Sequence, residues 1–301
     1  MTATGDPSIS VDNVHRSELT RMTASPSIRT LTLPEVQTLI DWARREGWNP
    51  GRDDAAPMHA ADPDGFIGCF VEGVMVAGIS AVRYGEDFGF IGLYICHPEH
   101  RGNGYGRLVW NAAMAHLDGR IIGLDGVPEQ QDNYARMGFS PVYRTVRWSG
   151  LAPAGLSRGA DIRDVSAGEL AGLEAFDSRY FPAPRKPFLD LWLQPPRVSV
   201  VAEREDRIEG YAVLRDCADG AKIGPLFATS EARAEEILAA CLSARAGSTV
   251  YLDVPDHQGS FADVLKGLDF RPGFTTARMY RGEPPATSLA GVFAVTTLEL
   301  G

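Results

Sequence analysis

The spacing of hydrophobic residues in the first part of the chain changes from strand-like to helical and back. Residues 28–33 form a short apolar segment that predicts a strand. The helix expected next carries apolar residues at intervals near 3.6, at Val36, Leu39, Ile40 and Ala43. It ends at Gly47, and the polar residues 48–54 are typical of a turn. Two further apolar segments, 65–71 and 75–83, are separated by Glu-Gly and therefore predict a hairpin.

Strands and helices alternate after this hairpin. We expect a strand at 88–96, a helix at 107–117, a strand at 121–124 and a helix from about 129 to 137. Such alternation, after a run of neighbouring strands, indicates a mixed α/β fold.

The chain divides at residues 149–160, where the composition shifts to Gly, Ala, Pro and Ser, as in a linker. A repeated pattern supports this division. Leu-Asp-Gly-Val-Pro at 124–128, a helix and Gly-Phe-Ser-Pro at 138–141 are echoed by Leu-Asp-Val-Pro at 252–255, a helix and Asp-Phe-Arg-Pro at 269–272. A duplicated unit explains both, and chance similarity is the alternative. Residues 292–300 alternate enough to predict a final strand that closes a sheet.

Length and composition describe a globular protein with two domains. The 301 residues exceed the usual size of one compact domain. With 44% hydrophobic and 23% charged residues, the chain has no apolar segment long enough to cross a membrane. The polar residues 1–27 lack the apolar segment of a secretory signal, so we interpret them as a flexible leader and expect a cytoplasmic location.

Charge and cysteine content narrow the partners. A net charge of −10 and a pI of about 5.1 argue against nucleic acids and anionic membranes, which require clustered Lys and Arg. The four cysteines are widely spaced, so we expect free thiols and no bound metal. The oligomeric state stays open, with a homodimer as one possibility.

The segment with the most specific chemistry is His-Pro-Glu-His-Arg-Gly-Asn-Gly-Tyr-Gly at 97–106, between a predicted strand and a predicted helix. Its glycines allow the backbone to turn inward, and amides at the start of a helix favour a phosphate group. A P-loop is excluded because no Lys-Ser or Lys-Thr follows. The dinucleotide-binding Gly-x-Gly-x-x-Gly turn does not fit either, since the glycines are spaced Gly-x-Gly-x-Gly and lie away from the strand end.

Two motifs together resemble one family. Arg101-x-x-Gly104-x-Gly106 is similar to the acetyl-CoA signature of the GNAT superfamily of N-acetyltransferases, and Tyr134-Ala-Arg-Met-Gly-Phe139 resembles a downstream motif of that family. The predicted order of elements over 28–148 matches as well. The resemblance implies an α/β protein of two tandem GNAT-like domains, each with a mixed, mostly antiparallel sheet flanked by helices. The expected parts are a catalytic domain at 28–148, a linker at 149–160, a degenerate domain at 161–281 and a tail at 282–301.

The same resemblance implies acetyl-CoA as cosubstrate. Its pyrophosphate would bind the amides of the glycine turn, and its pantetheine arm would pair like an added strand with residues 93–96. A backbone amide beside the thioester would support the developing oxyanion. The expected cofactor-binding residues are Tyr94, Ile95, Cys96, Arg101, Gly102, Asn103, Gly104, Tyr105, Gly106 and Asn133.

The catalytic acid is easier to place than the base. Tyr134 matches the position where the family often keeps the acid that protonates the departing CoA thiolate, although an ordinary core tyrosine is the alternative. Several family members carry a glutamate that residues 88–92 lack here. Asp125 is the ionisable residue nearest to that position. It is expected either to orient the acceptor ammonium or relay its proton, or to serve only as a carboxylate in a structural turn. We expect direct attack by the amine and no acetyl-Cys96, which lacks an activating partner.

The acceptor side is predicted at Trp48, Asn49 and Asp53, with Asp54 beside them, because an aromatic ring and carboxylates can hold a cationic amine. The second half has lost the cofactor signature: residues 228–233 contain no glycine, and Leu265 stands in place of the tyrosine. One cofactor per chain follows.

The sequence therefore predicts an acetyl-CoA-dependent N-acetyltransferase that acts on a primary amine of a small molecule. A non-catalytic acyl-CoA-binding or sensor protein is one alternative, because the strand glutamate is missing. An acetyltransferase for protein amines is the other.

Overall fold

The computed structural model describes residues 25–166 and 170–301, so residues 1–24 of the predicted leader lie outside it. Among the described residues, no helix is long and apolar enough to span a membrane. The first half consists of β1 (Ser27–Thr30), α1 (Leu33–Arg45), α2 (Ala55–Ala61), β2 (Phe66–Val71), β3 (Val74–Tyr84), β4 (Phe88–Cys96), α3 (Tyr105–His116), β5 (Ile121–Gly126), α4 (Pro128–Arg136) and β6 (Ser140–Leu151).

The second half repeats the strand and helix pattern. It consists of β7 (Ile162–Asp164), α5 (Leu170–Asp177), α6 (Lys186–Trp192), β8 (Val198–Arg204), β9 (Arg207–Asp216), β10 (Ala221–Ala228), α7 (Glu231–Ser243), β11 (Thr249–Pro255), α8 (Gly259–Gly267), β12 (Arg271–Arg281) and β13 (Val292–Ala294). Short 3₁₀ turns lie at Pro98–His100 and Leu289–Gly291.

Local sequence signals explain where the first helix begins and ends. Thr32 precedes α1, and the Glu35 carboxylate accepts a hydrogen bond from the Thr32 amide at 2.8 Å, so the pair forms a capping box. Gly47 follows the helix with a φ of +84°, a conformation that favours glycine. These signals lie within a few residues of one another, which is why the sequence predicted this helix well.

Two of the differences from the sequence prediction concern α2 and β6. The helix α2 was missed because its seven residues are too few to show a helical period. The strand β6 continues to Leu151, so residues 149–151 of the predicted linker belong to a strand. Pairing with β11 over this stretch supplies the backbone partners that turn a linker-like composition into a strand.

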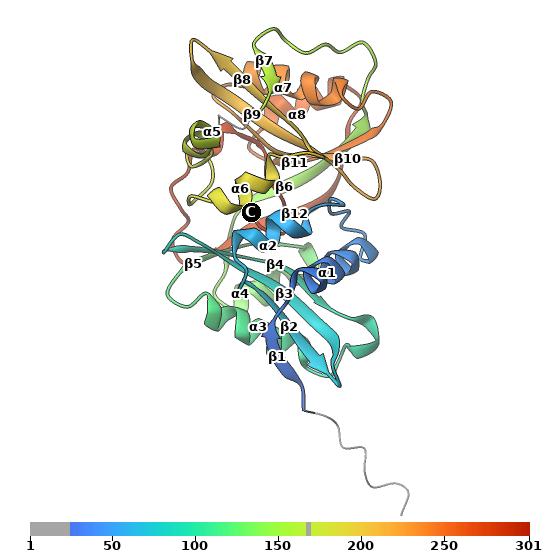
Figure 1. Ribbon diagram of the computed structural model, residues 1–301, viewed down its shortest axis with the longest axis vertical. Coiled ribbons are helices and arrows are strands. Elements are labelled where there is room, and N and C mark those ends of the chain that lie inside the picture. The colour runs from blue at the N-terminus through green and yellow to red at the C-terminus, as the bar shows by residue number, and fades with distance from the viewer. Residues whose placement is uncertain (1–24, 167–169) are drawn as a thin grey trace, which may run out of the picture.

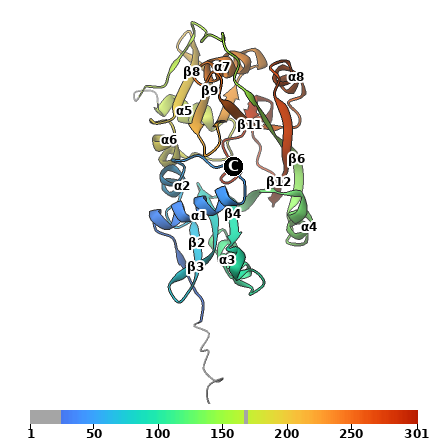
Figure 2. The same ribbon diagram turned by 90° about the vertical axis from the view of Figure 1, so that its right-hand side faces the viewer.

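The strands of both halves form one continuous sheet, in the order β1-β2-β3-β4-β5-β12-β6-β11-β10-β9-β8-β7. The last long strand of the chain, β12, lies between β5 and β6, and β6 lies against β11 of the second half. The two halves have thus exchanged their final strands. Both strands run side by side between the two halves (Figures 1 and 2).

Two buried ion pairs join the exchanged strands to the sheet. Asp125 of β5 accepts hydrogen bonds from Arg278 of β12 at 3.0 and 2.8 Å. Asp253 of β11 accepts hydrogen bonds from Arg147 of β6 at 2.7 and 2.9 Å. Each arginine follows the phenylalanine of its repeat by eight residues. The duplication therefore includes the ion pair, and each aspartate is paired with an arginine from the other half.

Three apolar cores hold the layers together. One lies between α3 and the sheet of the first half, and a second lies against α7 and α8. The third joins residues of α1 and α2 to residues of α5 and α6, so it belongs to both halves. The end of the chain also lies between the halves (Figures 1 and 2).

Candidate active site

One edge of β4 is open near the end of the strand. The parallel pairing with β5 extends only from Phe88 to Ile91, and among the described residues no other strand pairs with this edge beyond that point. A bulge shifts the register against β3, and Leu93 has a φ of +44°. Backbone groups after Ile91 therefore face a gap between β4 and β5.

A cavity of about 620 Å³ follows this edge. We call it the cofactor cavity, because residues that the sequence predicted to bind a cofactor line it. It is bordered by the end of β4, the end of β5, α4 and the segment after α1. Among its lining residues are seven that the sequence predicted, namely Trp48, Tyr94, Ile95, Cys96, Arg101, Asp125 and Tyr134. The structure thus brings together residues from distant parts of the first half.

The glycine turn lies between β4 and the first turn of α3. Gly102 and Gly104 both have a φ of +82°, which explains why glycine is needed at these positions. Gly104 is the N-cap of α3, and no side chain caps the helix there. A Cβ atom on either glycine would have no neighbour within 4 Å, so the turn is open on the outside. Uncapped amides with open space before them suit an anionic group.

Arg101 and Asn103 hold the turn in shape. The Arg101 Nε donates to the Cys96 carbonyl at 3.0 Å, and its guanidinium contacts Glu46 at 2.5 Å. The Asn103 side-chain amide donates to the His100 carbonyl at 3.1 Å. Both predicted cofactor residues therefore form contacts within the protein, and these contacts fix the entrance of the turn.

The side chains of Tyr94 and Ile95 pack into the protein. Ile95 is buried, and the Tyr94 ring lies 5.5 Å from the Trp110 ring. A Cβ atom on Gly106 would lie 2.9 Å from the Tyr94 hydroxyl, so the glycine lets the tyrosine reach under α3. These two residues can therefore serve the cavity chiefly through their backbone groups.

Tyr134 lies on α4 across the cavity from β4. Its ring stacks on Trp110 at a centroid distance of 5.6 Å. Burial raises the pKa of Tyr134 to about 12, and the nearby Tyr94 adds to that shift. The phenol thus stays neutral and keeps its proton. The ring serves the core while the residue also lines the cavity, so the packing role and the chemical role are compatible.

The side chains of Cys96 and Asn133, two further predicted cofactor residues, have different environments. Burial raises the pKa of the Cys96 thiol, although Arg101 opposes this shift, so little thiolate is present at neutral pH. The Asn133 side chain donates to Gln130 at 2.7 Å and accepts from Arg136, and these contacts stay within α4. A contact between Asn133 and the cofactor stays a prediction.

Asp125 borders the cavity with its backbone. Its side chain has no exposed surface, and both carboxylate oxygens accept hydrogen bonds from Arg278. Burial raises the pKa of Asp125, and the Arg278 guanidinium opposes that shift. This geometry favours a role in holding the end of β5 over direct contact with an acceptor.

The three predicted acceptor residues differ in position. Trp48 lines the cofactor cavity. The Asn49 side chain donates to the Asp219 carbonyl at 2.8 Å and accepts from the Asp219 amide at 3.1 Å, so it joins the two halves. Asp53 is exposed, and its carbonyl accepts from Arg197 at 2.6 Å. Asp54 is buried between Arg197 and Arg215.

A second cavity of about 470 Å³ lies between the halves. Trp48 lines both cavities. The second half contributes Asp219, Tyr251 and Phe274 to its wall, and the first half contributes Arg147. Aromatic rings and a carboxylate thus border a space that shares Trp48 with the cofactor cavity.

The described residues of the second half form no equivalent open site. The Ser230 side chain caps α7 by accepting a hydrogen bond from the Arg233 amide, and Leu265 is buried in the core. The strands β10 and β11 pair only from Ala221 to Ile223, as β4 and β5 do near their starts. Here the gap is filled, because β13 pairs with β10 at Phe227 and Leu226. A strand thus begins where the sequence predicted one, but it spans only Val292–Ala294 instead of residues 292–300, and it takes the place that is open beside β4.

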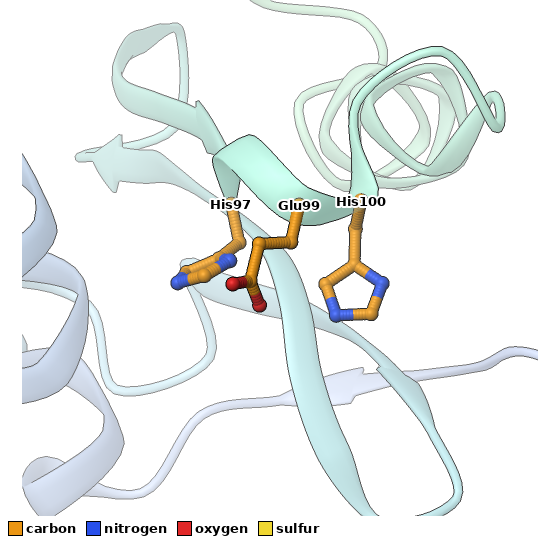
Figure 3. A group of neighbouring side chains, drawn as sticks. All are labelled: His97, Glu99 and His100. Atoms are coloured by element: carbon orange, nitrogen blue, oxygen red, sulfur yellow. The ribbon is translucent and has the colours of Figure 1, made fainter.

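Three neighbouring side chains precede the glycine turn (Figure 3). His97, Glu99 and His100 place their ligand atoms within 4.8 Å of one another. The His97 ring packs 5.3 Å from the Trp42 ring, and its Nδ1 is enclosed without a partner. We predicted no metal from the sequence, and that stays a prediction.

Sequence reasoning missed several residues of the site. Glu46, which holds Arg101, gave no signal because its partner is far along the chain. Gln130 lines the cavity, and its side-chain oxygen accepts a hydrogen bond from the Asn133 side-chain amide at 2.7 Å. Arg278 was missed although a signal existed, because extending the repeat by a few residues aligns it with Arg147.

Comparisons with known proteins agree with this geometry. The acetyltransferase (GNAT) family matches residues 33–139, and an acetyltransferase (GNAT) domain matches residues 173–294. A curated relative, holothin acyltransferase from Pseudoalteromonas sp. (strain SANK 73390), is 32% identical over 272 residues, which cover 90% of this chain and 92% of the relative. The chain therefore belongs to the GNAT family of acyltransferases. It is a transferase with two GNAT domains in tandem.

Solved structures share the fold at low sequence identity. A crystal structure of an acetyltransferase candidate from Pyrococcus horikoshii has a TM-score of 0.78 and 19% identity, covering 96% of this chain and all of the other. A tandem GNAT protein from the clavulanic acid biosynthesis pathway has a TM-score of 0.59 and 14% identity, covering 86% of this chain and all of the other. These likenesses support the tandem architecture.

Proposed function

We propose that this protein transfers an acetyl group from acetyl-CoA to a primary amine of a small molecule. The observation that carries the proposal is the open edge of β4, which faces Tyr134 and leads to an uncapped helix start. An extended thioester arm with a pyrophosphate at one end matches such a surface.

The cofactor would bind from the turn toward the interior. Amides of residues 102–106 would hold the pyrophosphate, and the pantetheine arm would pair with the β4 backbone after Ile91. The amine nitrogen would attack the thioester carbonyl, form the amide bond and expel sulfur as CoA thiolate. A β4 amide would stabilise the oxyanion, and the Tyr134 hydroxyl would donate to the departing sulfur.

The acceptor would enter through the cavity between the halves. Trp48, Tyr251 and Phe274 offer aromatic surface, and Asp219 offers a negative charge for a cationic amine. Because both halves border this space, it favours a small molecule over a peptide in an open groove. The curated relative is named for holothin and for acyl transfer, which also supports a small-molecule acceptor.

The test measures release of CoA thiol from acetyl-CoA across a panel of primary amines, with the product identified by mass spectrometry. We expect acetylation of a subset of amines, and calorimetric titration with CoA should give one site per chain. Tight CoA binding without thiol release for any small amine would contradict the proposal. Release only with peptide amines would favour a protein acceptor instead.

A further inference from the structure

The tail of the chain crosses from the second half into the first. After β13, the Val295 amide donates to the Asp253 carbonyl at 2.9 Å. Five residues later, the Leu300 carbonyl accepts from the Tyr84 hydroxyl at 3.2 Å. Residues on this path are largely buried. The tail that fills the gap beside β10 therefore continues to the sheet that carries the open edge of β4.

Glu299 lies directly against β4. Its carbonyl accepts from the Ser80 hydroxyl at 3.3 Å, and a Cβ atom on Gly92 would lie 2.0 Å from the same carbonyl. Any larger residue at 92 would therefore displace the tail. The Thr297 hydroxyl accepts from the Glu299 amide at 3.2 Å and from the Leu300 amide at 2.8 Å, which fixes the backbone here.

Glu299 borders a small cavity of about 50 Å³. Trp48, Asp125 and Val127 line both this cavity and the cofactor cavity, so the two spaces adjoin. The residue is 4% exposed, yet among the described residues its carboxylate forms no ion pair or hydrogen bond. Neither carboxylate oxygen is fully enclosed, unlike Asp54 Oδ1, and the residue lines this cavity.

Most other charged groups around Glu299 are already paired. Asp125 binds Arg278, and Asp253 binds Arg147. Arg215 binds Asp54 behind them. The buried Lys222 donates to the Trp48 carbonyl at 3.4 Å. Burial lowers the pKa of Lys222, as does Arg147, whereas Asp253 and Glu299 oppose this shift. Glu299 is thus the carboxylate of this cluster that forms no ion pair with an arginine among the described residues.

We propose that Glu299 is the general base of the acyl transfer, supplied by the tail in place of the glutamate that β4 lacks. This inference rests on the proposed function. Glu299 takes the proton of the acceptor ammonium, directly or through one water, and frees the nitrogen lone pair. The amine then attacks the thioester carbonyl, the carbon–sulfur bond breaks, and the second proton that the nitrogen loses passes to the departing sulfur through Tyr134, so CoA leaves as the thiol. Asp125 and Arg278 position the strand end beside it.

The experiment compares the wild type with Glu299→Gln, which keeps the size of the side chain and its backbone contacts. Glu283→Gln is the matched control, because Glu283 is an exposed glutamate earlier in the same tail. Acetyl-CoA is supplied with benzylamine, an ammonium ion at neutral pH, or with aniline, which is neutral there, alongside the fastest amine of the panel. CoA affinity and the thermal midpoint of each variant are measured in parallel.

We expect Glu299→Gln to lower kcat for benzylamine by about 10²-fold or more at neutral pH, with CoA affinity unchanged. The loss should shrink for aniline, and for benzylamine it should shrink as pH rises and more free amine forms. Equal turnover of Glu299→Gln and wild type, or equal losses for both amines at every pH, would overturn this role for Glu299. A wild type that acetylates no amine would instead overturn the proposed function.

Discussion

At the residue scale, Tyr134 combines a packing role in the core with its proposed role as the catalytic acid. Its ring is held between Trp110 and Phe139, so the hydroxyl cannot move far from the cavity. The packing that raises its pKa also keeps it protonated. A neutral, fixed phenol is suited to donate a hydrogen bond to a charge that develops only as the thioester breaks.

Removing that hydroxyl gives a direct prediction. Tyr134→Phe keeps the ring, so CoA affinity and stability should change little, while kcat should fall by about 10²-fold because the thiolate loses its donor. Steady-state kinetics and CoA titration measure both quantities. Because the pKa of Tyr134 is raised to about 12, wild-type activity should show no alkaline loss from this group below that pH. Unchanged kcat in Tyr134→Phe would assign the tyrosine to packing alone.

The ion pair of Asp125 gives a second prediction at this scale. Arg278→Met should lower the free energy of unfolding by about 3–5 kcal/mol, because it leaves a carboxylate buried without a partner. Arg144→Met is the control on the neighbouring strand. Arg144 is 72% exposed and pairs with Asp256 at the surface, so its loss should cost less than about 1 kcal/mol. Urea unfolding measures both, and equal effects would contradict the buried-pair argument.

At the scale of elements, the two halves share an order of strands and helices but differ at two equivalent places. The helix α3 begins at Gly104 without a side-chain cap, whereas α7 is capped by Ser230. The gap beside β4 is open, and the equivalent gap beside β10 holds β13. The second half has therefore paired with its own chain the backbone groups that the first half leaves open.

Paired substitutions at the two helix starts test this contrast. Gly104→Ala places a Cβ at a φ of +82°, which strains the turn, and CoA affinity should fall about tenfold. Ser230→Ala should cost about 1 kcal/mol of stability through loss of the cap and leave CoA affinity unchanged. Titration calorimetry and thermal unfolding measure the two effects. A loss of CoA affinity in Ser230→Ala would point to a second cofactor site.

At the scale of the whole molecule, the exchange of β6 and β12 makes the halves interdependent. Each half of the continuous sheet is completed by a strand from the other half of the chain, and one apolar core contains helices of both halves. The cofactor site depends on this arrangement, because Asp125 is held by a strand that the second half supplies.

We therefore expect the protein to unfold as one unit despite its two domains. Urea transitions followed by tryptophan fluorescence and by far-UV circular dichroism should coincide. Hydrogen exchange should give similar protection to the central strands β5 and β11. Separate transitions for the two halves would show that the shared sheet and core couple them only weakly.

Much of the fold could be predicted from the sequence because its signals are local. The strand at 88–96 and the helix after the glycine turn follow from short-range periodicity and glycine placement. The cavity residues of the first half also follow, because their motifs keep fixed spacing. Asn49 shows the limit, since it lines the second cavity and its acceptor role stays a prediction, while its contact with Asp219 of the other half gave no local signal.

The sequence by itself determined the family motifs, the duplication and the loss of the glycine turn in the second half, because each depends on residues close together in the chain. Only the tertiary structure decided which strand pairs with which, since β5–β12 and β6–β11 compete for similar partners after a duplication. It also decided the position of Glu299, which lies against Ser80 and Gly92 although more than two hundred residues separate it from each of them in the chain. Such contacts depend on burial and shape across the whole molecule, and no local pattern encodes them.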